Sequence, residues 1–261
     1  RNPNYWGNDL PINRGRGNFD VIRIEYFADG NAAFEGFKSG AYTFKLENSS
    51  KTWATGYDFP ALNDGHVVKK TLPDGGIATG QSFVMNLRRP KFQDIRVREA
   101  IAHLFNFEWS NESLFYGQYA RVNSFWENSE FAATGAPTSA ELALLTPLAD
   151  KLPEGILTDE AVMGVTSGMR GTDRKNLRAA SVLLDEAGWS VGDGGLRRNL
   201  EGETLKIELL ERSPAFDRVV LPFVENLKAA GIDATYSRVD PAQYTDRTRN
   251  YDFDIITDQF P

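Results

Sequence analysis

The sequence contains no cysteine and only two histidines, His66 and His103, among its 261 residues. Without cysteine the chain can form no disulfide, no thiolate nucleophile and no Cys-ligated zinc site. Neither histidine has a partner at the spacing that a metal site requires, and no Gly-x-Ser-x-Gly turn is present for a hydrolase nucleophile. The sequence therefore predicts neither a metal site nor a hydrolase triad, and we expect no cofactor.

The chain also lacks a long apolar run and a stripe of basic residues. No stretch approaches the roughly 18–20 apolar residues that a membrane-spanning helix needs. The formal net charge is −7, and basic residues are scattered among acidic ones. Because nucleic-acid binding needs clustered positive charge, we expect no nucleic-acid partner. Arg1 begins without a secretory leader, so any targeting segment is expected upstream or removed.

Apolar and aromatic residues are abundant, at 41% and 12% of the chain. Disordered chains lack this apolar mass, so we expect a folded chain of one or two domains.

The first eighty residues predict one β-α-β unit followed by a connector. Residues 21–26 have the pattern of a strand, residues 31–38 that of a helix, and residues 41–46 that of a second strand. Residues 47–80 are rich in turn-forming side chains and contain a short strand-like piece at 66–72. One such unit is too small for its own sheet, so we expect it to join sequence outside this chain.

The remaining residues alternate between strand and helix patterns. Strands are predicted at residues 81–87, 205–210, 232–239 and 253–257, and a Gly-rich hairpin at 192–195. Helices are predicted at residues 94–105, 111–119, 139–152, 173–186, 214–230 and 241–249. This order is typical of an α/β fold in which helices pack on the faces of an open sheet. The last strand appears without an element to pack beside it, which predicts that the chain is a fragment.

Large aromatic side chains occur in turn-rich sequence, where they are not usually found. Flanking Asn, Ser and Gly suit a cleft in which rings exclude water and amides hydrogen-bond a ligand. Asp258 follows a predicted buried strand, at the carboxyl end where open α/β sheets bind ligands, and could pair with an ammonium group. The predicted ligand-binding residues are Trp53, Tyr57, Tyr119, Phe125, Trp126, Asp258 and Phe260. The alternatives are that the rings fill the cores and that Asp258 caps a loop.

Carboxylates offer a different class of function. Two of them could act as the acid and base of a carbohydrate-active enzyme. The candidates are Glu127, Glu130, Asp252, Asp254 and Asp258. Solvated faces account for most of these residues, so we keep the enzyme only as the alternative to a binding protein.

Three ordered motifs resemble the extracellular solute-binding proteins of family 5, the peptide-binding components of ABC importers. They are RNPNYWG at residues 1–7 with FDVI at 19–22, AFEGFKSGAYTF at 33–44, and FVMNLRRP at 83–90 with FQDIRVREAI at 92–101. Residues 48–57, 114–119 and 124–130 are similar to the YejA-like subgroup.

The resemblance implies a two-lobe α/β fold of the periplasmic binding protein type II kind, with mixed open sheets flanked by helices. Residues 1–80 would belong to the first lobe and the approach to the hinge, and residues 81–261 to a second lobe that is incomplete at its end. The family implies a periplasmic, monomeric binding protein, not an enzyme, that delivers oligopeptides to membrane permease subunits. Related members take opines, murein peptides or nickel chelates.

In peptide-binding relatives, a carboxylate just after the strand that corresponds to residues 253–257 anchors the ligand amine. The resemblance therefore implies this role for Asp258, although residues 259–261 depart from the Trp-containing pattern of those relatives.

Overall fold

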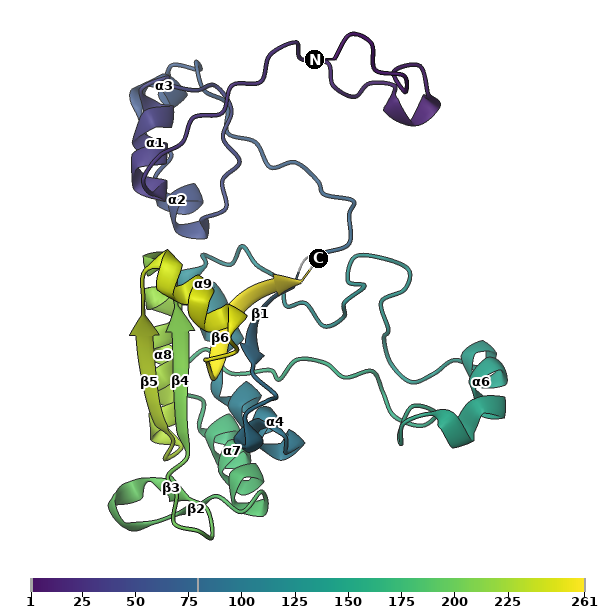
Figure 1. The fold of residues 1–261 in the computed structure, drawn as a ribbon, viewed down its shortest axis with the longest axis vertical. Helices are drawn as coiled ribbons and strands as arrows, with labels where there is room; N and C mark the ends of the chain where they lie inside the picture. The colour runs from purple at the N-terminus through teal and green to yellow at the C-terminus, as the bar shows by residue number, and fades with distance from the viewer. Residues whose placement is uncertain (1, 79, 261) are drawn as a thin grey trace. The chain divides into compact units, whose positions relative to one another are not determined.

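The computed structural model describes residues 2–78 and 80–260 (Figure 1). The chain divides into two compact units, Arg1–Lys70 and Thr71–Pro261. Among the described residues, no helix combines the length and the apolar character that crossing a membrane would require.

The first unit contains short helices only. They are η1 (Pro11–Asn13), α1 (Gly30–Lys38), α2 (Ser50–Thr55) and α3 (Pro60–Asn63). Helix α1 confirms the helix predicted at residues 31–38. It starts there because the Asp29 carboxylate accepts the backbone N–H groups of Asn31 and Ala32 at 2.8 and 2.9 Å. This cap satisfies two of the amides that a helix leaves free at its first turn.

The strands predicted at residues 21–26, 41–46 and 66–72 are wrong for this structure, because no strand forms in residues 2–70 or at 71–72. The side chains of Val21, Ile24 and Tyr26 are 83, 66 and 88% exposed. A strand exists only when a neighbour accepts and donates its ladder hydrogen bonds. The described residues of this unit provide no such neighbour, so the predicted β-α-β unit keeps only its helix.

The second unit is built on a four-stranded sheet with the order β1-β6-β4-β5. Its strands are β1 (Gly80–Met85), β4 (Lys206–Glu211), β5 (Asp233–Arg238) and β6 (Ile255–Phe260). Strand β4 runs parallel to β5 and β6, whereas β1 is antiparallel to β6. The last strand therefore lies inside the sheet, and the expectation that nothing packs beside it is wrong. An open mixed sheet flanked by helices confirms the predicted α/β class.

The two faces of the sheet are covered by different helices. Alternate side chains of a strand point to opposite faces, so Leu209 and Ile255 enter one core and Leu210 and Ile256 the other. The larger core contains residues of α4 (Ile95–Leu104), α7 (Arg174–Glu186) and α8 (Asp217–Ala229). The smaller core contains Tyr244 of α9 (Pro241–Arg249), the helix drawn in yellow in Figure 1.

The helices of this core confirm the predictions that rested on capping residues. Asp94 and Asp173 accept backbone N–H groups at the starts of α4 and α7. Gly188 and Gly231 follow α7 and α8 at φ of 85°, the left-handed conformation that ends a helix. The predicted hairpin is the pair β2 (Ser190–Val191) and β3 (Arg197–Arg198), joined through η4 (Asp193–Gly195).

Other boundaries differ from the predictions. Helix α5 (Phe107–Leu114) begins before residue 111 and is followed by Tyr116 and Gly117 at positive φ, which stop it. The helix predicted at residues 139–152 is α6 (Ser139–Leu145) followed by the 3-10 helix η3 (Thr146–Lys151), because Pro147 lacks an N–H. Two further 3-10 turns are η2 (Pro90–Phe92) and η5 (Pro214–Phe216).

Candidate functional site

Trp53 and Tyr57, two of the predicted ligand-binding residues, lie in an aromatic cluster of the first unit. The Tyr57 ring centroid is 5.6 Å from that of Trp53 and 5.1 Å from that of Phe34 on α1. Phe59 completes this cluster at 6.1 Å from Tyr57, and it is buried. Trp53 and Tyr57 themselves are half-buried. Both rings therefore help to form the core of this unit while part of each stays accessible.

A polar edge surrounds the same cluster. Lys69 Nζ lies 4.3 Å from the Trp53 ring centroid, a cation–π contact. The Tyr57 hydroxyl donates to Glu47 at 3.2 Å, and Glu47 pairs with Lys45 at 2.9 Å. Burial, followed by the nearby Glu47 charge, raises the pKa of Tyr57 to about 12. Tyr57 is therefore a neutral hydrogen-bond donor at every physiological pH.

Tyr119, Phe125 and Trp126 lie in the long connection between α5 and α6 of the second unit. Their side chains are 43, 79 and 53% exposed. Asn111 fixes Tyr119 by accepting its N–H at 3.1 Å and donating to its carbonyl at 2.8 Å. The Trp126 ring is 6.0 Å from Phe131, which is itself 68% exposed. Unlike the rings of the first unit, these rings offer apolar surface to solvent.

Asp258 lies inside strand β6 and not after it, which corrects the predicted strand end at residue 257. The strand is longer because β1 continues to pair with it, with Ser82 opposite Asp258 and Gly80 opposite Phe260. Asp258 remains exposed and accepts the backbone N–H of Gln259 at 2.9 Å. Phe260 belongs to β6, but its side chain lies outside the part of the chain that the structure describes.

A buried carboxylate marks the carboxyl end of β4, where this strand meets the middle of β6. Glu211, the last residue of β4, is 3% exposed. Its Oε1 accepts the N–H groups of Arg212 and Ser213 at 2.7 and 3.0 Å, and its Oε2 accepts the hydroxyl of Thr257 on β6. Because both oxygens are used, Glu211 ties the end of β4 to β6 and orients the chain that leads into α8.

Tyr244 links this edge to α9. Its side chain is 8% exposed, and its hydroxyl donates to the Thr257 carbonyl at 3.4 Å. The Arg212 guanidinium lies over the ring, 5.1 Å from its centroid. Burial raises the pKa of Tyr244, Glu211 and Asp258 raise it further, and Arg212 opposes them. The charges of Glu211, Arg212 and Asp258 therefore all act on Tyr244. Of these three side chains, Arg212 and Asp258 are exposed.

The edge of β4 and β6 is a surface feature and not a closed pocket. The hollow beneath it is lined by Phe83, Leu210, Val220, Ile256 and Thr257, among others, and has no room for a water molecule. Any ligand would therefore contact the exposed groups of the edge.

Glu211, Arg212 and Tyr244 were not predicted from the sequence. Glu211 and Arg212 directly follow the strand predicted at residues 205–210, and, like Asp258, they lie at the carboxyl end of a predicted strand, where open α/β sheets bind ligands. Nothing in the sequence indicated that Tyr244, on a helix between two strands, would meet them.

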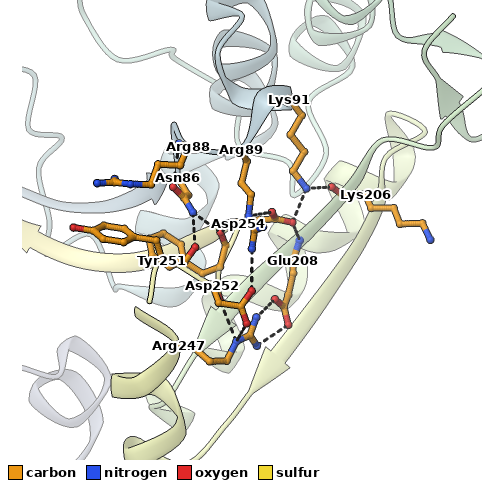
Figure 2. Close-up of polar contacts among 11 residues, drawn as sticks. Asn86, Arg88, Arg89, Lys91, Lys206, Glu208, Arg247, Tyr251, Asp252 and Asp254 are labelled. Atoms are coloured by element: carbon orange, nitrogen blue, oxygen red, sulfur yellow. Dashed lines mark hydrogen bonds and ion pairs between the residues drawn. The ribbon is translucent and has the colours of Figure 1, made fainter. Parts of the chain in front are cut away.

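The opposite ends of the same strands hold a dense polar network, drawn in Figure 2. Asp254 accepts Lys91 Nζ at 2.7 Å and the Glu208 N–H at 2.9 Å. Asp252 pairs with Arg89 at 2.9 Å and with Arg247 at 3.3 Å. These contacts bind the starts of β4 and β6 to the segment that follows β1.

The network uses two of the carboxylates that the enzyme alternative would need. Asp252 and Asp254 are engaged by cations, and Glu127 accepts the N–H of Asn123 at 3.0 Å within its own loop. The other three candidates, Glu127, Glu130 and Asp258, have no ion pair with a cation among the described residues.

Comparison with known proteins gives the family. The family model described as bacterial extracellular solute-binding proteins, family 5 Middle, matches residues 1–260. The probable peptide-binding protein YejA of Agrobacterium fabrum is 42% identical over 257 residues, which are 98% of this chain and 42% of that protein. The chain thus spans about two fifths of the length of the curated relatives it matches.

Two solved structures have a similar fold. NikA from Brucella suis in complex with Fe(III)-EDTA matches with a TM-score of 0.54 and 20% identity, over 91% of this chain and 41% of that one. The oligopeptide-binding protein AppA from Bacillus subtilis in complex with a nonapeptide matches with a TM-score of 0.54 and 18% identity, over 89% and 39%. With the family model matching nearly every residue, the chain belongs to family 5 of the bacterial extracellular solute-binding proteins.

Proposed function

We propose that this chain is part of a periplasmic receptor that captures oligopeptides and delivers them to the permease subunits of an ABC importer. The family and the YejA relative support a binding protein for peptides. We propose further that the receptor acts as a monomer and has no catalytic activity of its own.

The observation that carries the peptide assignment is Asp258. It is exposed on β6, one residue after Thr257, which bonds the last residue of β4, and no cation among the described residues pairs with it. A free carboxylate in this position can bind the ammonium group of a peptide through charge-assisted hydrogen bonds. Asp258 is therefore our candidate for the residue that fixes the amino end of the ligand.

The aromatic side chains supply the second part of the mechanism. Phe125 and Trp126 expose most of their rings, and Tyr119, Trp53 and Tyr57 are partly accessible. Rings of this kind remove water from side chains of many shapes, whereas polar groups and trapped water hold the peptide backbone. Such a site tolerates sequence variation, and ligand binding would shift an equilibrium between open and closed states.

The test uses the full-length protein that contains this chain. It is incubated with a mixed peptide pool, and retained species are identified by mass spectrometry. We expect peptides to be retained, and N-acetylation of a retained peptide to weaken its binding at least tenfold, the loss of one charge-assisted contact. Asp258→Asn should remove this preference for a free amine, whereas the control Glu225→Gln, an exposed residue of α8, should keep it.

Two results would contradict the proposal. Retention of no peptide at all would contradict the function. Equal binding of free and acetylated peptides by the unmodified protein would contradict the role of Asp258 but not the peptide-binding function.

A further inference from the structure

The ammonium group of Lys69 lies against two of the predicted ligand-binding rings. Lys69 Nζ is 4.3 Å from the centroid of the Trp53 ring and 5.2 Å from that of the Tyr57 ring, and it donates to the Trp53 carbonyl. The two ring centroids are 5.6 Å apart, and the ring planes are inclined by 59°. Two rings and one carbonyl oxygen therefore contact a single cation. We call Trp53 and Tyr57 the aromatic cage.

The surroundings of the aromatic cage favour a positive charge. The face of an aromatic ring attracts a cation through its quadrupole. The Tyr57 hydroxyl donates to Glu47 at 3.2 Å, so a carboxylate with a 5% exposed side chain lies beside this ring. Glu47 pairs with Lys45 at 2.9 Å and therefore keeps a cationic partner whether or not Lys69 is present.

Lys69 can leave the aromatic cage at low cost. Among the described residues, no ion pair joins it to a carboxylate, so its departure leaves no anion unpaired. Its side chain is half-buried, and residues 68–75 form neither a helix nor a strand that would hold it in place. The contacts that Lys69 gives up are one carbonyl and two ring faces, and a cation of another molecule can make all of them.

We propose that the aromatic cage is a subsite for a cationic side chain of the ligand, lysine or arginine, and that Lys69 occupies it until the ligand displaces it. Lys69 belongs to a segment without helix or strand, so the protein presents to the cage the same chemical group that a bound peptide would present. Lys69 thus acts as an internal competitor. The inference rests on the proposed peptide-binding function and adds the class of side chain that Trp53 and Tyr57 accept.

The test measures dissociation constants of the full-length protein by isothermal titration calorimetry. The probes are four tetra-alanine peptides that carry lysine at one position each, and four partners that carry norleucine there. Norleucine has the same straight side chain without the ammonium group. In Lys69→Ala the competitor is gone, so at one position or more we expect the preference for lysine over norleucine to rise about twofold to thirtyfold above that of the unmodified protein. This is the range of one cation–π contact.

Two further variants separate the aromatic cage from the general effect of charge. Lys70→Ala removes the same charge from the next residue, which is exposed, and should leave the preference unchanged. Lys69→Arg keeps a cation that can occupy the aromatic cage. We therefore expect Lys69→Arg to behave like the unmodified protein and not like Lys69→Ala.

The inference is overturned if no position shows the rise in Lys69→Ala, or if Lys70→Ala raises the preference as much as Lys69→Ala does. In either case, retention of any peptide from the mixed pool would leave the proposed function intact. Retention of none would contradict that function as well.

Discussion

Asn86 and Phe253 are 167 residues apart in the sequence, yet the Asn86 amide donates to the Phe253 carbonyl at 2.9 Å. The same amide donates to the Tyr251 carbonyl at 2.9 Å, and its oxygen accepts the Arg88 N–H at 3.1 Å. Asn86 is 4% exposed. One buried side chain thus joins the segment after β1 to the segment before β6.

Asn86→Leu should therefore destabilise the protein by about 2–3 kcal/mol, because two carbonyls and one amide lose their partner in a buried place. The measurement is urea unfolding. The free energies of unfolding are compared with the same slope against urea concentration for both proteins. Asn250→Ala is the control, since this exposed side chain bonds only the neighbouring Asp246, and should cost no more than about 0.5 kcal/mol. A similar cost for both variants would contradict the importance of the buried contacts.

Arg197 is the largest of the fully buried side chains, at 1% exposure. Its guanidinium donates to the carbonyls of Ala230 and Trp189 at 2.6 Å and to Ser181 and Asp185 at 2.7 Å. It thereby joins strand β3 to the carboxyl ends of α7 and α8, where a positive charge is favourable.

Arg197→Met should cost about 3 kcal/mol, because it leaves these carbonyls buried without a donor. Asp185→Asn should cost less than about 1 kcal/mol, since the Asp185 side chain is 54% exposed and the ion pair is open to water. Thermal unfolding of the two variants distinguishes the contributions. A larger loss for Asp185→Asn would show that the ion pair dominates and not the carbonyl contacts.

The ion pair of Glu208 and Arg247, with oxygen and nitrogen 2.6 Å apart, gives a pH-dependent contribution to stability. The hydrogen bond from Arg247 lowers the pKa of Glu208 in the folded protein, against the opposing effect of burial. A carboxyl group with a lowered pKa stabilises the fold above its unfolded pKa of about 4.3, and this contribution is lost as the pH falls through the folded pKa.

Glu208→Gln should thus lower the free energy of unfolding by about 1–2 kcal/mol at pH 7. The difference from the unmodified protein should shrink as the pH is lowered from 5 towards 3. Denaturant unfolding at several pH values measures it, with Glu201→Gln in an exposed turn as the control. A difference that stays constant with pH would contradict the assignment.

The sequence predicted those elements whose signals are local. Asp94 and Asp173 begin α4 and α7 because an aspartate one residue before an apolar periodic segment can cap its free amides. Gly188 ends α7 for an equally local reason. These local signals predicted the order of strands and helices in the second unit. That alternating order in turn predicted the α/β class.

Features that depend on distant partners could not be predicted in the same way. Residues 21–26 have a strand pattern but form no strand, since pairing requires a neighbour that pattern alone does not supply. Asp258 was placed after a strand, whereas pairing with β1 extends β6 past it. The network around Asp254 joins residues about 160 positions apart, and no spacing in the sequence indicates it.

For the candidate site, the useful sequence signal was the position of a residue at the carboxyl end of a predicted strand. It selected Asp258, and it would have selected Arg212, which follows β4. The stack of Arg212 on Tyr244 required the structure, because α9 brings Tyr244 to the edge from a different part of the chain.

The strand order also has a consequence for how the second unit is made. Strand β1 precedes its partner β6 by 170 residues along the chain, from Met85 to Ile255. Because β6 also separates β1 from β4, the sheet cannot pair all of its strands before β6 has been synthesised. Helices form from local contacts, whereas closure of this sheet needs contacts between residues far apart in the sequence, which slows the folding of this unit.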